Sequence, residues 1–276
     1  MKGKFFNFLC FFGLAIILTS CGEYNKVLKN PDLEVKYTYA KKYFDQKKYT
    51  RSAALLEDVV PMFRGTSHAQ EALYLLAQSY YGLKDYSAAT QYFSTYYKTY
   101  PKGDYTELAR YYAAYGQYLD SPIPQLDQSQ TYEAIKLFQE FLEFFPQSEY
   151  KDEANRALFE LYEKLAFKEL QAIKLYYNLG NYVVGYPFPG GNYMSCVITA
   201  QNALKDFPYS KYKEEFMYYS IRSLFDMAKS SVDEKKNSRY RDVREEYYAY
   251  LNEFPDGKYL KQVTKIFEQT NKELNN

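Results

Sequence analysis

The sequence contains no tryptophan, a single histidine (His68) and only three cysteines. Metal sites of the H-E-x-x-H or C-x-x-C type are therefore missing. Phosphate-binding glycine motifs are missing too, because neither G-x-x-x-x-G-K-S/T nor G-x-G-x-x-G occurs. We expect no metal, no cofactor and no enzymatic activity. We interpret His68 as a helix-capping residue at the surface and acidic pairs such as Asp152-Glu153 as solvated helix faces.

Neither sign of charge dominates, since 35 Lys and Arg residues face 34 Asp and Glu residues. Residues 1–20 contain two of the lysines and no acid, so their removal changes the net charge from +1 to −1. A protein that binds nucleic acid through its phosphates needs an excess of positive charge. We therefore expect no nucleic-acid partner.

A run of apolar residues from Phe5 to Leu18 follows Lys2 and Lys4. It is shorter than the roughly 20 residues that cross a bilayer. The run leads into Leu18-Thr19-Ser20-Cys21, which resembles a bacterial lipobox. We predict that residues 1–20 are a lipoprotein signal peptide, that acylated Cys21 attaches to membrane lipid, and that residues 21–32 form a lipidated tether. The alternative is an ordinary signal peptide, but Cys21 stands where its small-residue cleavage site would lie.

No disulfide is expected. Cys10 leaves with the signal peptide, Cys21 is modified, and Cys196 has no partner. Cys196 occupies a position where related segments carry alanine, so we interpret it as a small buried residue.

Aromatic residues are abundant, with 35 Tyr and 20 Phe, and many recur at fixed intervals. Between Glu71 and Tyr105, the spacing of Leu76-Ala77, Tyr80, Ala89, Phe93 and Pro101 is that of a tetratricopeptide (TPR) repeat. The alanines let two helices approach closely, Lys84-Asp85 makes the turn between them, and Pro101 ends the second helix. Parts of this pattern recur around Ala40, Ala134, Ala200 and Val243.

A second signature, F/Y-P-x-S/G-x-Y, marks the end of four repeats: Tyr100–Tyr105, Phe145–Tyr150, Phe207–Tyr212 and Phe254–Tyr259. In the first repeat Pro61 precedes Met62-Phe63-Arg64-Gly65, and no tyrosine follows. The sequence predicts an all-α fold, a TPR-type helical-hairpin solenoid of about five repeats. Residues 33–150 form the N-terminal repeats, and residues 151–276 form one long bridging helix and the C-terminal repeats.

Several boundaries follow from local signals. Asp32 or Pro31 begins the first helix, and the pairs Ser67/Gln70 and Asp104/Glu107 are predicted capping pairs. An exposed loop follows Leu119, and residues 151–179 lack glycine and proline and form the long helix. Residues 230–238 form a charged turn, and the last helix, 259–274, caps the stack.

The chain resembles the BamD/YfiO family of outer-membrane lipoproteins. The likeness is closest around Tyr111-Tyr112, Tyr118-Leu119-Asp120-Ser121 and the hexamer Phe145–Tyr150, and continues into the long helix. It implies a scaffold on the periplasmic face of the outer membrane. Its partners would be the β-barrel assembly subunit, bound by the C-terminal repeats, and unfolded outer-membrane proteins, bound by the N-terminal ones. Thr199 stands where family members carry an arginine that pairs with the barrel subunit.

Two sets of residues are candidate sites. The aromatic segment 180–193 holds the predicted partner-docking residues Tyr182, Tyr186, Phe188 and Tyr193, unless it folds on its own side chains. First helices of the repeats present a predicted substrate-peptide groove: Tyr37, Lys41, Phe44, Tyr74, Gln78 and Tyr81. Lys41 would meet the carboxylate of a peptide that ends in an aromatic residue. The alternative is that several of these tyrosines only pack between repeats.

Two other functions are compatible with an anchored TPR protein. One is a SusD-like protein that binds glycan, although such proteins are larger and use tryptophan platforms. The other is a general periplasmic adaptor, which only the family resemblance argues against.

Overall fold

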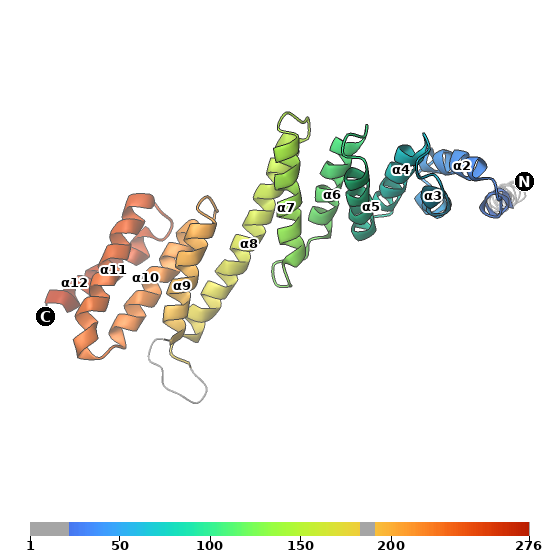
Figure 1. The fold of residues 1–276 in the computed structure, drawn as a ribbon. Coiled ribbons are helices and arrows are strands. Elements are labelled where there is room, and N and C mark those ends of the chain that lie inside the picture. Colours follow the sequence, from blue (N-terminus) through green and yellow to red (C-terminus); the bar gives the residue numbers. More distant parts are fainter. Residues whose placement is uncertain (1–21, 183–190, 276) are drawn as a thin grey trace, which may run out of the picture. The chain divides into compact units, whose positions relative to one another are not determined.

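The computed structural model describes residues 22–182 and 191–275. The predicted signal peptide, Cys21, Tyr186 and Phe188 lie outside the described residues. In the described part the regular structure is helical, without strands, which confirms the all-α solenoid (Figure 1). The helices are α2 (Leu33–Asp45), α3 (Tyr49–Met62), α4 (Ala69–Gly82), α5 (Tyr86–Thr99), α6 (Thr106–Asp120), α7 (Ser129–Phe144), α8 (Lys151–Leu179), α9 (Gly191–Asp206), α10 (Lys213–Lys229), α11 (Asp233–Glu253) and α12 (Leu260–Asn275).

The chain divides into two compact units, and α8 contributes residues to both. The first unit ends with Ala157 and leaves out Pro122–Gln128, which belong to the second unit together with the residues from Leu158 onward. None of the described helices is long and apolar enough to cross a membrane.

In the first unit, each of α2 to α7 packs against its neighbour in sequence. The alanines of the repeat pattern lie where helices cross, and Ala40, Ala77 and Ala89 are fully buried. Tyr43, Leu56 and Leu76 fill the first core, and Phe93 and Tyr96 fill the second. The steric basis of the TPR spacing is therefore confirmed: small residues bring the helix backbones together, and large residues pack around them.

In the second unit, the C-terminal half of α8 takes the place of a first repeat helix. Its residues Ala166, Leu170 and Ile173 share a core with α9 and α10. Cys196 is fully buried in this core, as its position predicted, and burial raises the pKa of its thiol. A second core joins α10, α11 and α12.

The hexamers form equivalent junctions after the second helix of each repeat. In each hexamer the backbone N–H of the fourth residue donates to the carbonyl of the first residue, as Gly103 does to Tyr100 at 3.0 Å. The final tyrosine then packs on a ring of the first helix of the same repeat. Ring centroids lie 4.4 Å apart for Tyr105 and Tyr74 and 4.1 Å apart for Tyr259 and Tyr218.

The first repeat also has this junction, which corrects the prediction that it departs after Pro61. Pro61 lies inside α3, and the segment equivalent to the hexamers is Phe63–His68, which begins two residues after Pro61. Thr66 N–H bonds to the Phe63 carbonyl as in the other junctions. His68 takes the place of the final tyrosine and packs on Tyr37 with centroids 5.1 Å apart.

The turn at Lys84-Asp85 is confirmed. Lys84 has φ 63°, and the Asp85 side chain accepts the Ala88 N–H at 3.1 Å, which caps α5. Asp32 caps α2 in the same way. The capping pairs at Ser67 and Asp104 are wrong, because the N-cap residues are one position later, His68 for α4 and Tyr105 for α6, and neither makes a side-chain cap.

Two predicted loops are shorter than expected. Residues 233–238 belong to α11, so only residues 230–232 join it to α10. Residues 191–193 form the first turn of α9 and not the end of the aromatic loop. The predicted tether is partly ordered as well, since residues 22–28 are helical and Val27 is buried in the first core.

The loop between α6 and α7 is exposed at its tip, as predicted, with Ile123 62% and Leu126 57% accessible. The buried Gln128 side chain holds its shape by donating to the Ile123 and Leu126 carbonyls at 2.8 and 3.0 Å. Lys168 of α8 also donates to the Leu126 carbonyl at 3.2 Å.

Candidate functional site

The first helices of repeats one and two share a polar network centred on Glu71 of α4. Tyr37 Oη donates to Glu71 Oε2 at 2.5 Å, and Lys41 Nζ lies 2.6 Å from Glu71 Oε1. These two donors lower the pKa of the Glu71 carboxyl. Burial, and then the bond to Glu71, raises the pKa of Tyr37. The network therefore joins α2 to α4 through a carboxylate that stays ionised.

Two of the six predicted groove residues lie in the seams between helices. Tyr37 is 4% exposed and packs edge-on against Phe63. Tyr74 is 9% exposed and stacks on Tyr105 with their planes 8° apart. These two tyrosines therefore pack between helices, as in the alternative interpretation of the groove.

The other four groove residues are partly exposed. The Lys41 side chain is 44% accessible, and Phe44 packs against Tyr49 at 5.6 Å. Gln78 Nε2 donates to Tyr74 Oη at 2.8 Å, and the ring of Tyr81 lies 5.2 Å from that of Tyr112. The face thus offers one ammonium, one amide and aromatic edges. Because Glu71 already neutralises Lys41, a substrate carboxylate would have to compete with Glu71.

Sequence reasoning missed Glu71. Equivalent positions of repeats one and two are 37 residues apart, as Tyr37 and Tyr74 are. Glu71 lies about one turn before Tyr74 on α4, and helical spacing alone does not show that its carboxylate reaches back to α2.

The described part of the predicted docking segment lies at the end of α8 and the start of α9. Tyr182 is 68% exposed, and its carbonyl accepts the Asn192 side-chain N–H at 2.7 Å. Tyr193 is half-buried against Tyr177, with ring centroids 5.8 Å apart. Tyr182 is therefore open to a partner, whereas Tyr193 positions the segment on α8.

Exposed apolar side chains lie on the two helices that precede and follow this segment. Leu175 and Leu179 lie one turn apart on α8, and Met194 and Ile198 lie one turn apart on α9. Leu175 is 57% and Ile198 50% accessible. We call these two pairs together the α8–α9 apolar patch, because exposed apolar residues are typical of interaction surfaces.

In the described residues no group of His, Cys, Asp or Glu is arranged to hold a metal ion.

A family model described as "YfiO: Outer membrane lipoprotein" matches residues 30–185. The match covers more than half of the chain, from the first repeat through the long helix. The chain belongs to the YfiO family. No curated protein matches it. One solved structure to which the chain is similar is that of a putative kinesin light chain from Podosopora anserina with nearly identical TPR-like repeats. It is 14% identical, with a TM-score of 0.33, over 87% of this chain and 96% of the other.

This YfiO member differs from the expected docking chemistry at one position. Thr199, at the place of the expected arginine, is half-buried on α9 and directly follows the exposed Ile198. Thr199 carries no charge, so an ion pair cannot form from this position.

Proposed function

We propose that this YfiO family protein is a lipid-anchored scaffold of the outer-membrane β-barrel assembly machine. It binds the barrel subunit and unfolded outer-membrane proteins on the periplasmic side. The single observation that carries the proposal is the family match over residues 30–185. A solenoid of helical hairpins fits this role, because it presents long surfaces for protein partners and needs no catalytic group.

The α8–α9 apolar patch supports docking of the barrel subunit through repeats four and five. Its exposed leucines precede, and its exposed Met194 and Ile198 follow, the aromatic segment in the sequence. Truncating an interface hot spot typically costs about 2 kcal/mol, or about thirtyfold in affinity. We expect Met194→Ser with Ile198→Ser to weaken co-purification of the barrel subunit to about that extent.

The test is affinity purification from solubilised envelope followed by mass spectrometry. Glu234→Gln and Glu245→Gln together, on exposed positions of α11, form a matched control that leaves the patch intact. Tyr186→Ala with Phe188→Ala tests the aromatic segment itself. Equal recovery of the barrel subunit from the patch variant and the control, with unchanged thermal melts, would contradict docking at this place.

For the unfolded substrate we propose the exposed part of the first-helix face: Lys41, Phe44, Gln78 and Tyr81. A peptide with the sequence of a barrel protein's last strand should crosslink to photoreactive groups placed at these positions. Removing its terminal aromatic residue should abolish the crosslinks. Crosslinks confined to repeats four and five would place the substrate site elsewhere.

For the anchor we propose acylation of Cys21. Cys21→Ala should release the protein from the outer-membrane fraction or leave it unprocessed. A variant that still sediments with outer membrane after a high-salt wash would show that another feature anchors it.

A further inference from the structure

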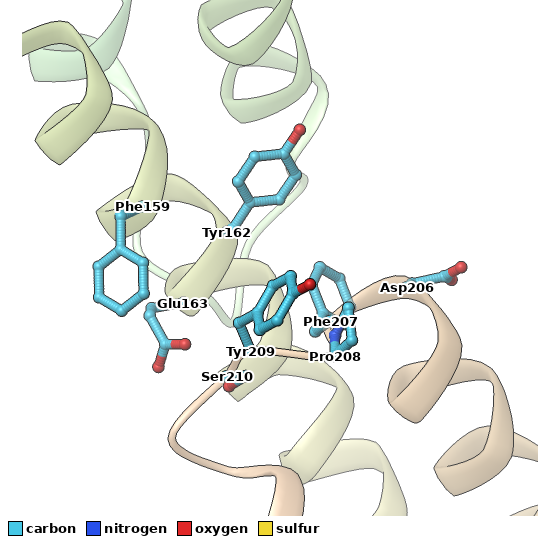
Figure 2. Close-up of a pocket in the computed structure, with 8 residues that line it drawn as sticks. All are labelled: Phe159, Tyr162, Glu163, Asp206, Phe207, Pro208, Tyr209 and Ser210. Atoms are coloured by element: carbon cyan, nitrogen blue, oxygen red, sulfur yellow. The ribbon is translucent and has the colours of Figure 1, made fainter.

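The junction after repeat four contains a pocket of about 270 Å³. Phe159, Tyr162 and Glu163 of α8 line it on one side, and residues of the segment 206–210 line it on the other (Figure 2). Most of its walls are aromatic or apolar. Tyr209 is 91% and Phe159 55% exposed, so two rings stand open to solvent around a pocket that belongs wholly to the second unit.

A buried carboxylate lies in this pocket. Glu163 is 8% exposed, and its Oε1 accepts the Lys211 backbone N–H at 3.2 Å. Its Oε2 is buried without a hydrogen-bond partner. Lys211 Nζ forms an ion pair with Oε2 at 3.9 Å, which is too long for a hydrogen bond, from a side chain that is 65% exposed. A carboxylate oxygen that is buried without a hydrogen-bond donor is costly, so it favours a donor that enters the pocket.

Comparison with the other repeats shows why the donor is missing. In repeat two, Tyr96 Oη donates to Gln70, and in repeat five Tyr250 Oη donates to Glu214 at 2.6 Å. Those tyrosines lie four residues before the hexamer, and their carbonyls accept its first N–H. In repeat four the same place is taken by Ala203. Ala203 is packed in the core of α8, α9 and α10, and its methyl group offers neither the donor nor the volume of a phenol ring.

We propose that this pocket binds a basic side chain, arginine or lysine, from a segment of a partner protein. The cation would donate to Glu163 Oε2, and its aliphatic stem would lie between the Phe159 and Tyr209 rings. Cations favour aromatic faces and carboxylates together, and guanidinium groups stack on such rings. Asp206 adds a second negative charge at the rim. The geometry of repeat four carries this inference whether or not the chain docks on a barrel subunit.

The test is selection of phage-displayed random peptides on the purified full-length chain and on its Glu163→Gln variant. Gln keeps an acceptor for the Lys211 N–H, so the junction should remain folded. The Gln side chain can still accept a hydrogen bond from a neutral donor, so the variant removes only the negative charge. We expect peptides enriched by the native chain alone to share an arginine or lysine beside an apolar residue.

Affinities of these peptides, measured by fluorescence anisotropy, give the contribution of the Glu163 charge to binding. Charge-assisted hydrogen bonds contribute enough for a loss of about tenfold or more with Glu163→Gln. Tyr209→Ser removes an exposed ring and should weaken binding severalfold. Glu160→Gln, an equal change of charge on an exposed turn of α8, is the matched control and should leave binding unchanged.

Three results would overturn the proposal. The first is no peptide selected by the native chain. The second is equal binding to the native chain and to Glu163→Gln, which would indicate a neutral donor. The third is selected peptides without a basic residue. Self-association of the chain that Glu163→Gln abolishes would assign the basic side chain to a second copy.

Discussion

At the scale of single residues, the choice of glycine or serine in the junction hexamers follows from the hydrogen bond between a tyrosine hydroxyl and its acceptor. A Cβ on Gly103 would lie 2.6 Å from Gln70 Oε1 and 2.7 Å from Tyr96 Oη, and a Cβ on Gly257 would meet Glu214 Oε1 and Tyr250 Oη. Where the second helix carries Phe141 or Ala203 in place of that tyrosine, the hexamer has serine. Glycine is thus needed only where a phenol hydroxyl occupies the space of its side chain.

Gly103→Ser should therefore destabilise the protein, by about 1–3 kcal/mol from overpacking. In a Tyr96→Phe background the hydroxyl is gone, and the added cost of Gly103→Ser should fall by about 1 kcal/mol. Urea denaturation of the four members of this double-mutant cycle measures the coupling. The control is Ser148→Gly, at a junction without the hydroxyl. It removes the Ser148 Oγ that accepts the Tyr150 N–H at 3.1 Å and adds backbone freedom, so it should cost about 1–2 kcal/mol, and glycine has no advantage there. Additive effects at Gly103 and Tyr96 would contradict the explanation.

Glu71 predicts a pH dependence. Its pKa is lowered from the ordinary value of 4.5 by Lys41 and Tyr37. The folded chain therefore holds this proton less tightly than the unfolded chain. The resulting stabilisation is present above pH 4.5 and is lost as pH falls through the lower, folded-state pKa. Glu71→Gln should reduce the acid-side slope of stability against pH, and the exposed Glu160→Gln should not. Equal slopes would show that the network adds no stability.

The candidate groove shows where sequence reasoning at this scale reaches its limit. Tyr37 and Tyr74 were placed on an open face, but both are buried in seams. On a first helix, the open face and the contact with the next repeat lie within one turn of each other. Helical spacing alone does not show which of these two faces a residue lies on. That depends on where a ring of the following junction, such as Tyr105, packs on the helix.

At the scale of elements, helix ends were predicted better than helix starts. Pro101, Pro146, Pro208 and Pro255 each follow the end of a helix, as their clash with the preceding turn predicts, whereas Pro61 lies within the last turn of α3. Starts at His68 and Tyr105 lack a side-chain cap, because turn hydrogen bonds organise the junction instead. The charged residues after Val232 resembled a turn, but Lys236 pairs with Asp233 at 3.0 Å within the first turns of α11.

The loop between α6 and α7 depends on one side chain. Gln128→Ala removes the buried amide that donates to the Ile123 and Leu126 carbonyls. We expect a loss of about 1–3 kcal/mol and faster hydrogen exchange confined to the loop and the adjacent ends of its helices. Gln125→Ala, on an exposed residue of the same loop, is the control. Unchanged exchange in Gln128→Ala would show that the loop is held by other contacts.

At the scale of the whole molecule, tyrosines such as Tyr43, Tyr96 and Tyr250 fill the cores together with leucines and alanines. The solenoid was predictable because each repeat packs mainly on its neighbours, so a local pattern defines the fold. The pocket of repeat four was not predictable, because the missing phenol donor is evident only when the junction is compared with those of repeats two and five.

This tyrosine content predicts sensitivity to alkali. Burial or bonding to carboxylates raises the pKa of Tyr37, Tyr74, Tyr81, Tyr111, Tyr177 and Tyr250 above the ordinary value of 10.0. The folded chain therefore keeps protons that the unfolded chain releases near pH 10. Stability from these phenols is complete below that pH and is lost as pH rises through the folded-state values. Denaturation midpoints should fall steeply between about pH 9 and about pH 11.

Phenolate absorbance provides the direct measurement, since the folded chain should titrate at higher pH than the chain in denaturant. Tyr111→Phe keeps the ring that stacks on Tyr150 but removes a buried hydroxyl, so it should reduce the alkaline slope. Tyr209→Phe, at a 91% exposed ring, should leave the slope unchanged. High salt should restore little stability, because desolvation rather than surface charge is the first cause of these shifts. Coincident titration of folded and unfolded chains would show that the tyrosine seams are open to water.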